Sequence, residues 1–155
     1  MPDSLILNPK MHPNEMYQEL CGCGITFVLL RKLGKEFQVS HEVWNDILAL
    51  CGMATICDVV PLNGVNHKLA KMGVSALVKS NHTVLKTLRR AAGAETDLDE
   101  FDIGFRVGPR INAVGRLEHA HLVIKAFVEN DCKPLIEQMS LLNDKRKLIL
   151  SLIHI

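Results

Sequence analysis

The stretch from Phe101 to Leu117, FDIGFRVGPRINAVGRL, holds three arginines, three glycines and a single acid. Glycines let a backbone approach a ligand closely, and guanidinium groups bind phosphate through paired hydrogen bonds. We expect Pro109 to interrupt a continuous helix, because it donates no N–H and disfavours helical geometry at Gly108. The stretch therefore predicts a rigid, cationic surface suited to a phosphodiester backbone. A solvated surface loop with scattered arginines is the alternative that the residues alone leave open.

Bulk composition limits what this surface can be. The 155 residues suffice for one domain with a buried core. The formal net charge of +1 argues against a generally basic nucleic-acid coat, so a nucleic-acid site must be local. The chain has no uninterrupted apolar run of about 18 residues and no visible signal peptide, which predicts a soluble, cytoplasmic protein without membrane contact.

The five cysteines form no Cys-x-x-Cys pair, and no histidine pair completes a zinc site with them. Most of them stand in apolar runs, so we expect small buried hydrophobic side chains in a reducing cytosol. His119 and His121 are two residues apart and cannot share one helix face. We therefore predict neither a structural zinc site nor a catalytic histidine.

Helix is the dominant predicted structure. Apolar periodicity indicates helices over residues 20–33, 41–52, 67–79, 84–92 and 117–130, and from 132 to at least 147. Ser40 is expected to cap the second helix, and the third should face inward through Leu69, Met72, Ala76 and Leu77. The short run Ser4–Leu7, which Asn8-Pro9 ends, predicts a buried strand. The pattern favours a predominantly helical part of an α/β domain.

Asp58 is the only acid in the apolar range 53–62. A buried ionised carboxylate is costly unless it is paired or binds a metal, and hard carboxylate oxygens suit Mg²⁺ or Mn²⁺. The structural alternative is that Asp58 caps a turn before Pro61. On the residues alone, both interpretations stay open.

Two motifs resemble those of RecJ-type single-stranded-DNA exonucleases, which belong to the DHH phosphoesterase superfamily. One is the ungapped arginine-rich stretch described first, and the other is Ala54–Leu62, which is similar to the fourth conserved motif of the family. The resemblance continues to about residue 147. It implies that Asp58 ligates a catalytic Mn²⁺ or Mg²⁺ ion. It also implies that DNA phosphates are bound by Arg110, with Arg106 and Arg116, and that Asn112 orients an arginine or hydrogen-bonds a phosphate.

The same resemblance implies a function for the full-length protein. A RecJ-type enzyme is a hydrolase that digests single-stranded DNA from 5′ to 3′, by attack of a metal-activated water on the phosphodiester, in DNA repair and recombination. Single-strand-binding protein and a helicase are its expected cellular partners. Two alternatives are a non-catalytic DNA- or protein-binding module derived from the superfamily, and a DHH phosphoesterase acting on short oligonucleotides or cyclic dinucleotides. Asp58 argues against the first, and the arginine-rich stretch argues against the second.

Several family motifs do not occur in this sequence: an Asp-x-Asp metal motif, a further aspartate, an Asp-His-His motif and the glycine-rich motif of a second lobe. Two-metal hydrolysis needs several ligands, so the chain alone is expected to be inactive. Residues 1–130 are expected to be the C-terminal part of the DHH catalytic domain, and 131–149 the start of the helix connecting the lobes. Residues 150–155 are either a non-native tail or a simple truncation. We also expect exposed apolar surface and poor solubility.

Overall fold

A computed structural model describes residues 5–11, 15–91, 93, 97–117, 121–133 and 135–137. These residues contain helices and no strand, which confirms the predominantly helical prediction. The chain divides into two compact units, which are described separately: Met1–Ser80 with Leu98–Glu100, and Asn81–Asp97 with Phe101–Ile155. None of the helices in the described ranges combines the length and the apolarity that a bilayer crossing requires.

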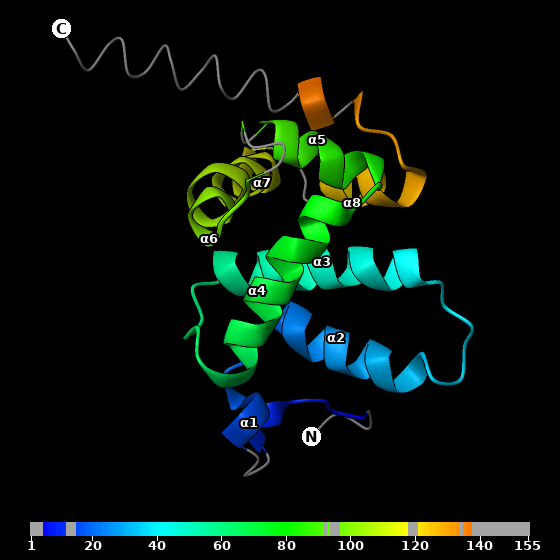
Figure 1. The fold of residues 1–155 in the computed structure, drawn as a ribbon, viewed down its shortest axis with the longest axis vertical. Coiled ribbons are helices and arrows are strands. Elements are labelled where there is room, and N and C mark those ends of the chain that lie inside the picture. Colours follow the sequence, from blue (N-terminus) through cyan, green and yellow to red (C-terminus); the bar gives the residue numbers. More distant parts are fainter. Residues whose placement is uncertain are drawn as a thin grey trace, which may run out of the picture. The chain divides into compact units, whose positions relative to one another are not determined.

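The first unit is built around α3 (His41–Cys57), against which two other helices pack (Figure 1). These are α2 (Gly22–Leu33) and α4 (Gly64–Lys79). Two short helical turns precede them, η1 (Pro9–Met11) and α1 (Glu15–Gln18). The unit is therefore a small helical bundle in which α3 is the central helix.

The start of α3 follows the sequence-based prediction, but its end does not. The Ser40 hydroxyl accepts a hydrogen bond from the Val43 N–H at 3.3 Å, which confirms Ser40 as the N-cap. The helix continues beyond the expected end at Gly52, because Met53, Thr55 and Ile56 are all buried in the bundle. Packing therefore outweighs the weak helix propensity of the glycine.

The crossing of α3 and α4 is a backbone contact between two glycines. A Cβ placed on Gly52 would lie 2.5 Å from the Cα of Gly73, and one on Gly73 would meet the Cα of Gly52 just as closely. Two side-chain hydrogen bonds join the same helices near the end of α4. Asn45 Nδ2 donates to the Ala76 carbonyl at 2.9 Å, and Ser80 Oγ donates to Asp46 Oδ1 at 2.6 Å. The crossing therefore depends on the absence of a side chain at both glycines.

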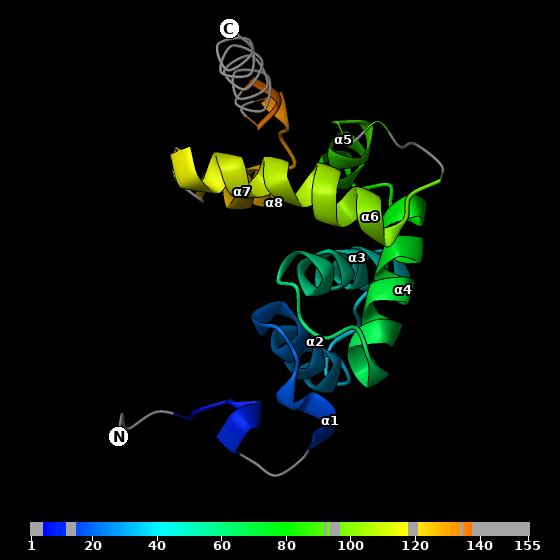
Figure 2. The same ribbon diagram turned by 90° about the vertical axis from the view of Figure 1, so that its left-hand side faces the viewer.

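The second unit contains α5 (Thr83–Ala91), the π-helix η2 (Ile103–Val107), α7 (Gly108–Leu117) and α8 (His121–Glu129). It also contains α6 (Glu100–Asp102) apart from its first residue. Figure 2 shows α6 and α7 as one continuous helical ribbon. The fully or nearly fully buried apolar side chains of the second unit include Val84, Leu85, Leu88, Ile103, Val107, Ala126 and Leu135. Residues 100–117 are thus helical throughout.

The prediction that Pro109 interrupts the helix is wrong. Gly108 has helical angles, φ −55° and ψ −50°, and its N–H reaches the carbonyl of Ile103, five residues back. This π turn widens the helix just before the proline. In a regular α-helix the proline ring clashes with the carbonyl four residues earlier, and the wider turn provides the space that the ring needs. The surface-loop alternative is therefore wrong too.

Two further predictions fail, and some lie outside the described residues. Leu5–Leu7 is irregular and exposed rather than a buried strand, because no neighbouring strand in the described ranges pairs with it. Leu69, Ala76 and Leu77 are buried as expected, but Met72 is 55% exposed. Ser4 and residues 118–120 and 138–155 lie outside the described residues. These ranges include His119, most of the predicted connecting helix and the tail 150–155.

We predict that Gly52→Ala lowers the free energy of unfolding by about 1–3 kcal/mol, the usual cost of overpacking. This loss outweighs the gain of up to about 1 kcal/mol in helix propensity. Urea denaturation measures the effect. Gly22→Ala is the matched control, because a Cβ there has no neighbour within 4 Å. Equal stability of the two variants would contradict the close backbone contact.

Candidate functional site

The helical stretch 100–117 carries an ion pair that fixes the direction of the Arg106 side chain. Arg106 Nη1 lies 2.6 Å from Asp102 Oδ1, one turn earlier. The Asp102 side chain is only 9% exposed, whereas the Arg106 side chain is 49% exposed. A carboxylate this buried needs a charged or hydrogen-bonding partner. Arg106 supplies one from the surface, and its guanidinium has further N–H donors beyond the one that faces Asp102.

Arg110 lies one turn beyond Arg106 on the same helix. Its Nη1 donates a hydrogen bond to the backbone carbonyl of Arg106, which holds the side chain along the helix axis. Its Nε is buried and has no hydrogen-bond acceptor among the described residues. A donor of this kind is costly to leave unpaired. Arg110 therefore combines an anchored guanidinium with one unsatisfied N–H.

The structure places all four predicted phosphate-binding residues on one continuous helical stretch, and it describes the side chains of three of them. Asn112 follows Arg110 in α7 and is exposed. Arg116 also belongs to α7, but its side chain lies outside the described ones. The expected rigidity of this surface therefore comes from a continuous helix and not from a proline-stiffened loop.

Asp58, the predicted metal ligand, lies in the first unit, at the C-cap of α3. Its N–H donates to the Ala54 carbonyl at 2.9 Å, and its side chain is exposed. The expectation of a buried carboxylate is therefore wrong, and the helix does end before Pro61, as the structural alternative required. Val59, the next residue, has a φ of +54°, which is a strained conformation for a β-branched residue.

Metal binding needs more than this carboxylate. Within the described ranges, no group of three or more histidine, cysteine, aspartate or glutamate side chains is arranged to hold a metal ion. A divalent magnesium or calcium ion takes six or more oxygen ligands. Asp58 can contribute to such a site, but the described residues do not complete one.

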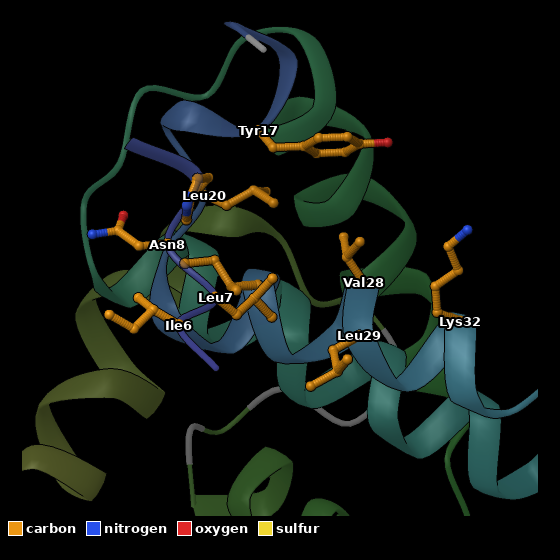
Figure 3. Close-up of a pocket in the computed structure, with 10 residues that line it drawn as sticks. Ile6, Leu7, Asn8, Tyr17, Leu20, Val28, Leu29 and Lys32 are labelled. Atoms are coloured by element: carbon orange, nitrogen blue, oxygen red, sulfur yellow. The ribbon is translucent and has the colours of Figure 1, made fainter. Parts of the chain in front are cut away.

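Sequence reasoning missed an apolar cavity of about 350 Å³ in the first unit. Figure 3 shows Ile6 and Leu7 of the N-terminal segment facing Val28 and Leu29 of α2 and Leu20, which precedes α2. The sequence signal for this cavity was the apolar run Ser4–Leu7, which we interpreted as a strand. Its lining offers few polar groups, so the cavity has the chemistry of a packing surface and not of a catalytic centre.

Comparison with known proteins shows what this chain resembles. No family model matches it. It is 31% identical over 138 residues to the single-stranded-DNA-specific exonuclease RecJ of Bacillus subtilis, covering 84% of this chain and 18% of that protein. RecJ of Haemophilus influenzae is 30% identical over 160 residues, covering 94% of this chain and 28% of the relative.

Solved structures agree with the sequence matches. RecJ from Thermus thermophilus in complex with Mn²⁺ superposes with a TM-score of 0.81 at 27% identity, over 98% of this chain and 23% of that chain. Its Mg²⁺ complex gives a TM-score of 0.77. The chain belongs to the RecJ family. It spans between 18% and 28% of the length of the two relatives named above.

The RecJ match supports the identity of the metal cofactor, but it does not test the role of any individual side chain. Solved RecJ structures contain Mg²⁺ or Mn²⁺, which supports these two ions as cofactors of the family. The roles assigned to Asp58, Arg106, Arg110, Asn112 and Arg116 stay predictions.

A group of thiols surrounds the start of α2 in this RecJ segment. Cys21 caps α2, since its Sγ accepts from the Gly24 N–H at 3.3 Å, and it lies 3.7 Å from Thr55 Oγ1 of α3. A hydrogen bond from the Cys51 thiol lowers the pKa of Cys23 to about 7, while burial and the charge of Asp58 oppose this effect. The same hydrogen bond, together with burial, raises the pKa of Cys51. Cys23 is thus the more acidic thiol of the pair.

We predict that Cys23 is alkylated by iodoacetamide with an apparent pKa near 7, because the thiolate is the reactive form. Reactivity should be full above this pH and fall as the pH drops through it. Cys51→Ala removes the hydrogen bond and should raise the pKa of Cys23 toward its ordinary value, which slows alkylation at neutral pH.

Mass spectrometry of the labelled chain measures each site in this experiment. Cys132→Ala is the control, because Cys132 is a buried thiol of the other unit. An unchanged pH profile of Cys23 in the Cys51→Ala variant would contradict the thiol hydrogen bond.

Proposed function

We propose that this chain is a DNA-binding segment of a RecJ-type single-stranded-DNA exonuclease. The full-length protein would hydrolyse phosphodiesters with Mn²⁺ or Mg²⁺, from 5′ to 3′, in DNA repair and recombination in the cytoplasm. The observation that carries the proposal is the single continuous helix that presents Arg106, Arg110 and Asn112. The RecJ match over most of the chain supports the same function.

Each side chain has a role that its chemistry supports. Arg110 binds a DNA phosphate with the guanidinium N–H groups that its hydrogen bond to the Arg106 carbonyl leaves available. Arg106 binds a neighbouring phosphate with the donors that Asp102 leaves available. Asn112 hydrogen-bonds a phosphate or orients an arginine, and Arg116 adds a further positive charge. Phosphate contacts of this kind position the strand without reading its sequence.

Asp58 is proposed as one ligand of the divalent-metal site. Its exposure leaves the carboxylate oxygens accessible, and the strained residue that follows it is a feature that clusters at functional positions. The described residues do not supply the remaining ligands, so no catalytic step is assigned to them. Single-strand-binding protein and a helicase are the proposed cellular partners.

A second candidate function is a non-catalytic DNA-binding module. The observation that favours it is the lack, in the described ranges, of a side-chain group that could hold a metal by itself. This candidate shares the phosphate-binding helix but needs no ion. The two functions therefore differ in whether Asp58 has a role.

We predict that the purified 155-residue chain releases no nucleotides from single-stranded DNA in the presence of Mn²⁺, because one carboxylate cannot hold two metal ions. Release of labelled mononucleotides measures the activity, with Thermus thermophilus RecJ as the positive control. Manganese-dependent digestion that Asp58→Asn abolishes would contradict this prediction and would mean that the chain forms a complete site.

We predict that Arg110→Ala weakens binding of single-stranded DNA and flattens its salt dependence. Loss of one phosphate contact should change the slope of log K against log salt concentration by about 0.7. Fluorescence anisotropy at several salt concentrations gives the slope.

Lys71→Ala serves as the control for this measurement, since it removes an exposed positive charge from α4. It should leave the slope unchanged. If Arg110→Ala and Lys71→Ala give the same slope as the unmodified chain, Arg110 does not contact phosphate.

A further inference from the structure

Two phenylalanines stack on each other at the surface of the second unit. The ring centroids of Phe101 and Phe105 are 4.6 Å apart, and the ring planes differ by 30°. Phe101 is 58% exposed and Phe105 is 69% exposed. Two of the five phenylalanines of the chain therefore form one solvent-facing aromatic pair.

The helix cannot turn these rings into the core. Asp102, Ile103 and Val107 are buried, and they fix the inward face of the stretch. The rings therefore belong to the outward face, along which the exposed residues Pro109 and Asn112 follow. Contiguous exposed apolar side chains, unlike single ones, are a feature of interaction surfaces.

The neighbours of the pair indicate what it contacts. Arg106 follows Phe105 directly and is half-exposed, and Arg110 lies one turn further along. Aromatic faces beside cationic groups are the combination that binds single-stranded nucleic acid, because the rings stack on bases while the cations contact phosphates. A purely apolar protein partner would not require arginines on the same helix.

We propose that Phe101 and Phe105 form a base-stacking platform for single-stranded nucleic acid, beside a phosphate track formed by Arg106 and Arg110. The platform deepens the proposed function and rests on it, since it assumes that this helix binds a single strand. Every base has a π face, so stacking tolerates any sequence. The bases and the phosphates of one strand would then be held by adjacent residues of one helix.

The test compares two oligonucleotides of equal length, oligothymidylate and a strand of abasic sugar phosphates. We expect Phe105→Leu to weaken oligothymidylate binding by about five- to 150-fold, the range for one stacked base. The slope of log K against log salt should not change, because no phosphate contact is lost. Phe105→Leu should bind the abasic strand as well as the unmodified chain does.

Matched variants separate stacking from folding. Phe105→Trp keeps an aromatic face and should retain affinity for oligothymidylate. Phe37→Leu replaces an equally exposed phenylalanine of the first unit, 67% exposed, and should have no effect. Circular dichroism establishes that each variant is folded, and Phe101→Leu replaces Phe105→Leu in the comparison if the latter is not.

Each outcome supports or overturns a specific statement. The platform is supported if Phe105→Leu loses affinity for oligothymidylate but not for the abasic strand, and if Phe105→Trp retains affinity for oligothymidylate. Unchanged oligothymidylate affinity in Phe105→Leu overturns the platform but leaves the proposed function intact. Equal losses of affinity for oligothymidylate and for the abasic strand also overturn it. The ring would then affect contacts with the sugar-phosphate backbone and not the stacking of a base. If the unmodified chain binds neither strand, the proposed function itself fails.

Discussion

The contact between Gly52 and Gly73 is the constraint on which the first unit depends. It lets the backbones of α3 and α4 touch, where a single added Cβ would lie 2.5 Å from the opposite chain. The hydrogen bonds from Asn45 to Ala76 and from Ser80 to Asp46 form only when the helices lie this close. Because α3 is held along its length, its last turn and the backbone of Asp58 have a defined position.

A second constraint shapes the arginine-rich helix. The π turn over Ile103–Val107 accommodates Pro109 and keeps residues 100–117 in one helical path. It also fixes which side chains point inward, since Ile103 and Val107 are buried. The arginines are thereby placed on a rigid element, which would hold the proposed phosphate-binding site more firmly than a loop would.

Much of this arrangement could be predicted from the sequence. Ser40 marked the start of α3 because a serine before an apolar-periodic run offers a cap. The arginine-rich stretch was identifiable from composition and from its resemblance to RecJ. The π turn was not, since it depends on how Ile103 and Val107 pack and not on a local signal. The exposure of Asp58 was missed for a similar reason, because an apolar neighbourhood in sequence does not determine which way one side chain faces.

We propose that this chain supplies the DNA-binding segment of a RecJ-type exonuclease. The most direct test is to exchange the matching segment of Thermus thermophilus RecJ for this chain and to measure Mn²⁺-dependent digestion of single-stranded DNA. We expect the chimera to digest DNA, and we expect Arg110→Ala within it to weaken digestion mainly by raising KM. A folded chimera that binds Mn²⁺ but digests no DNA would contradict this proposal.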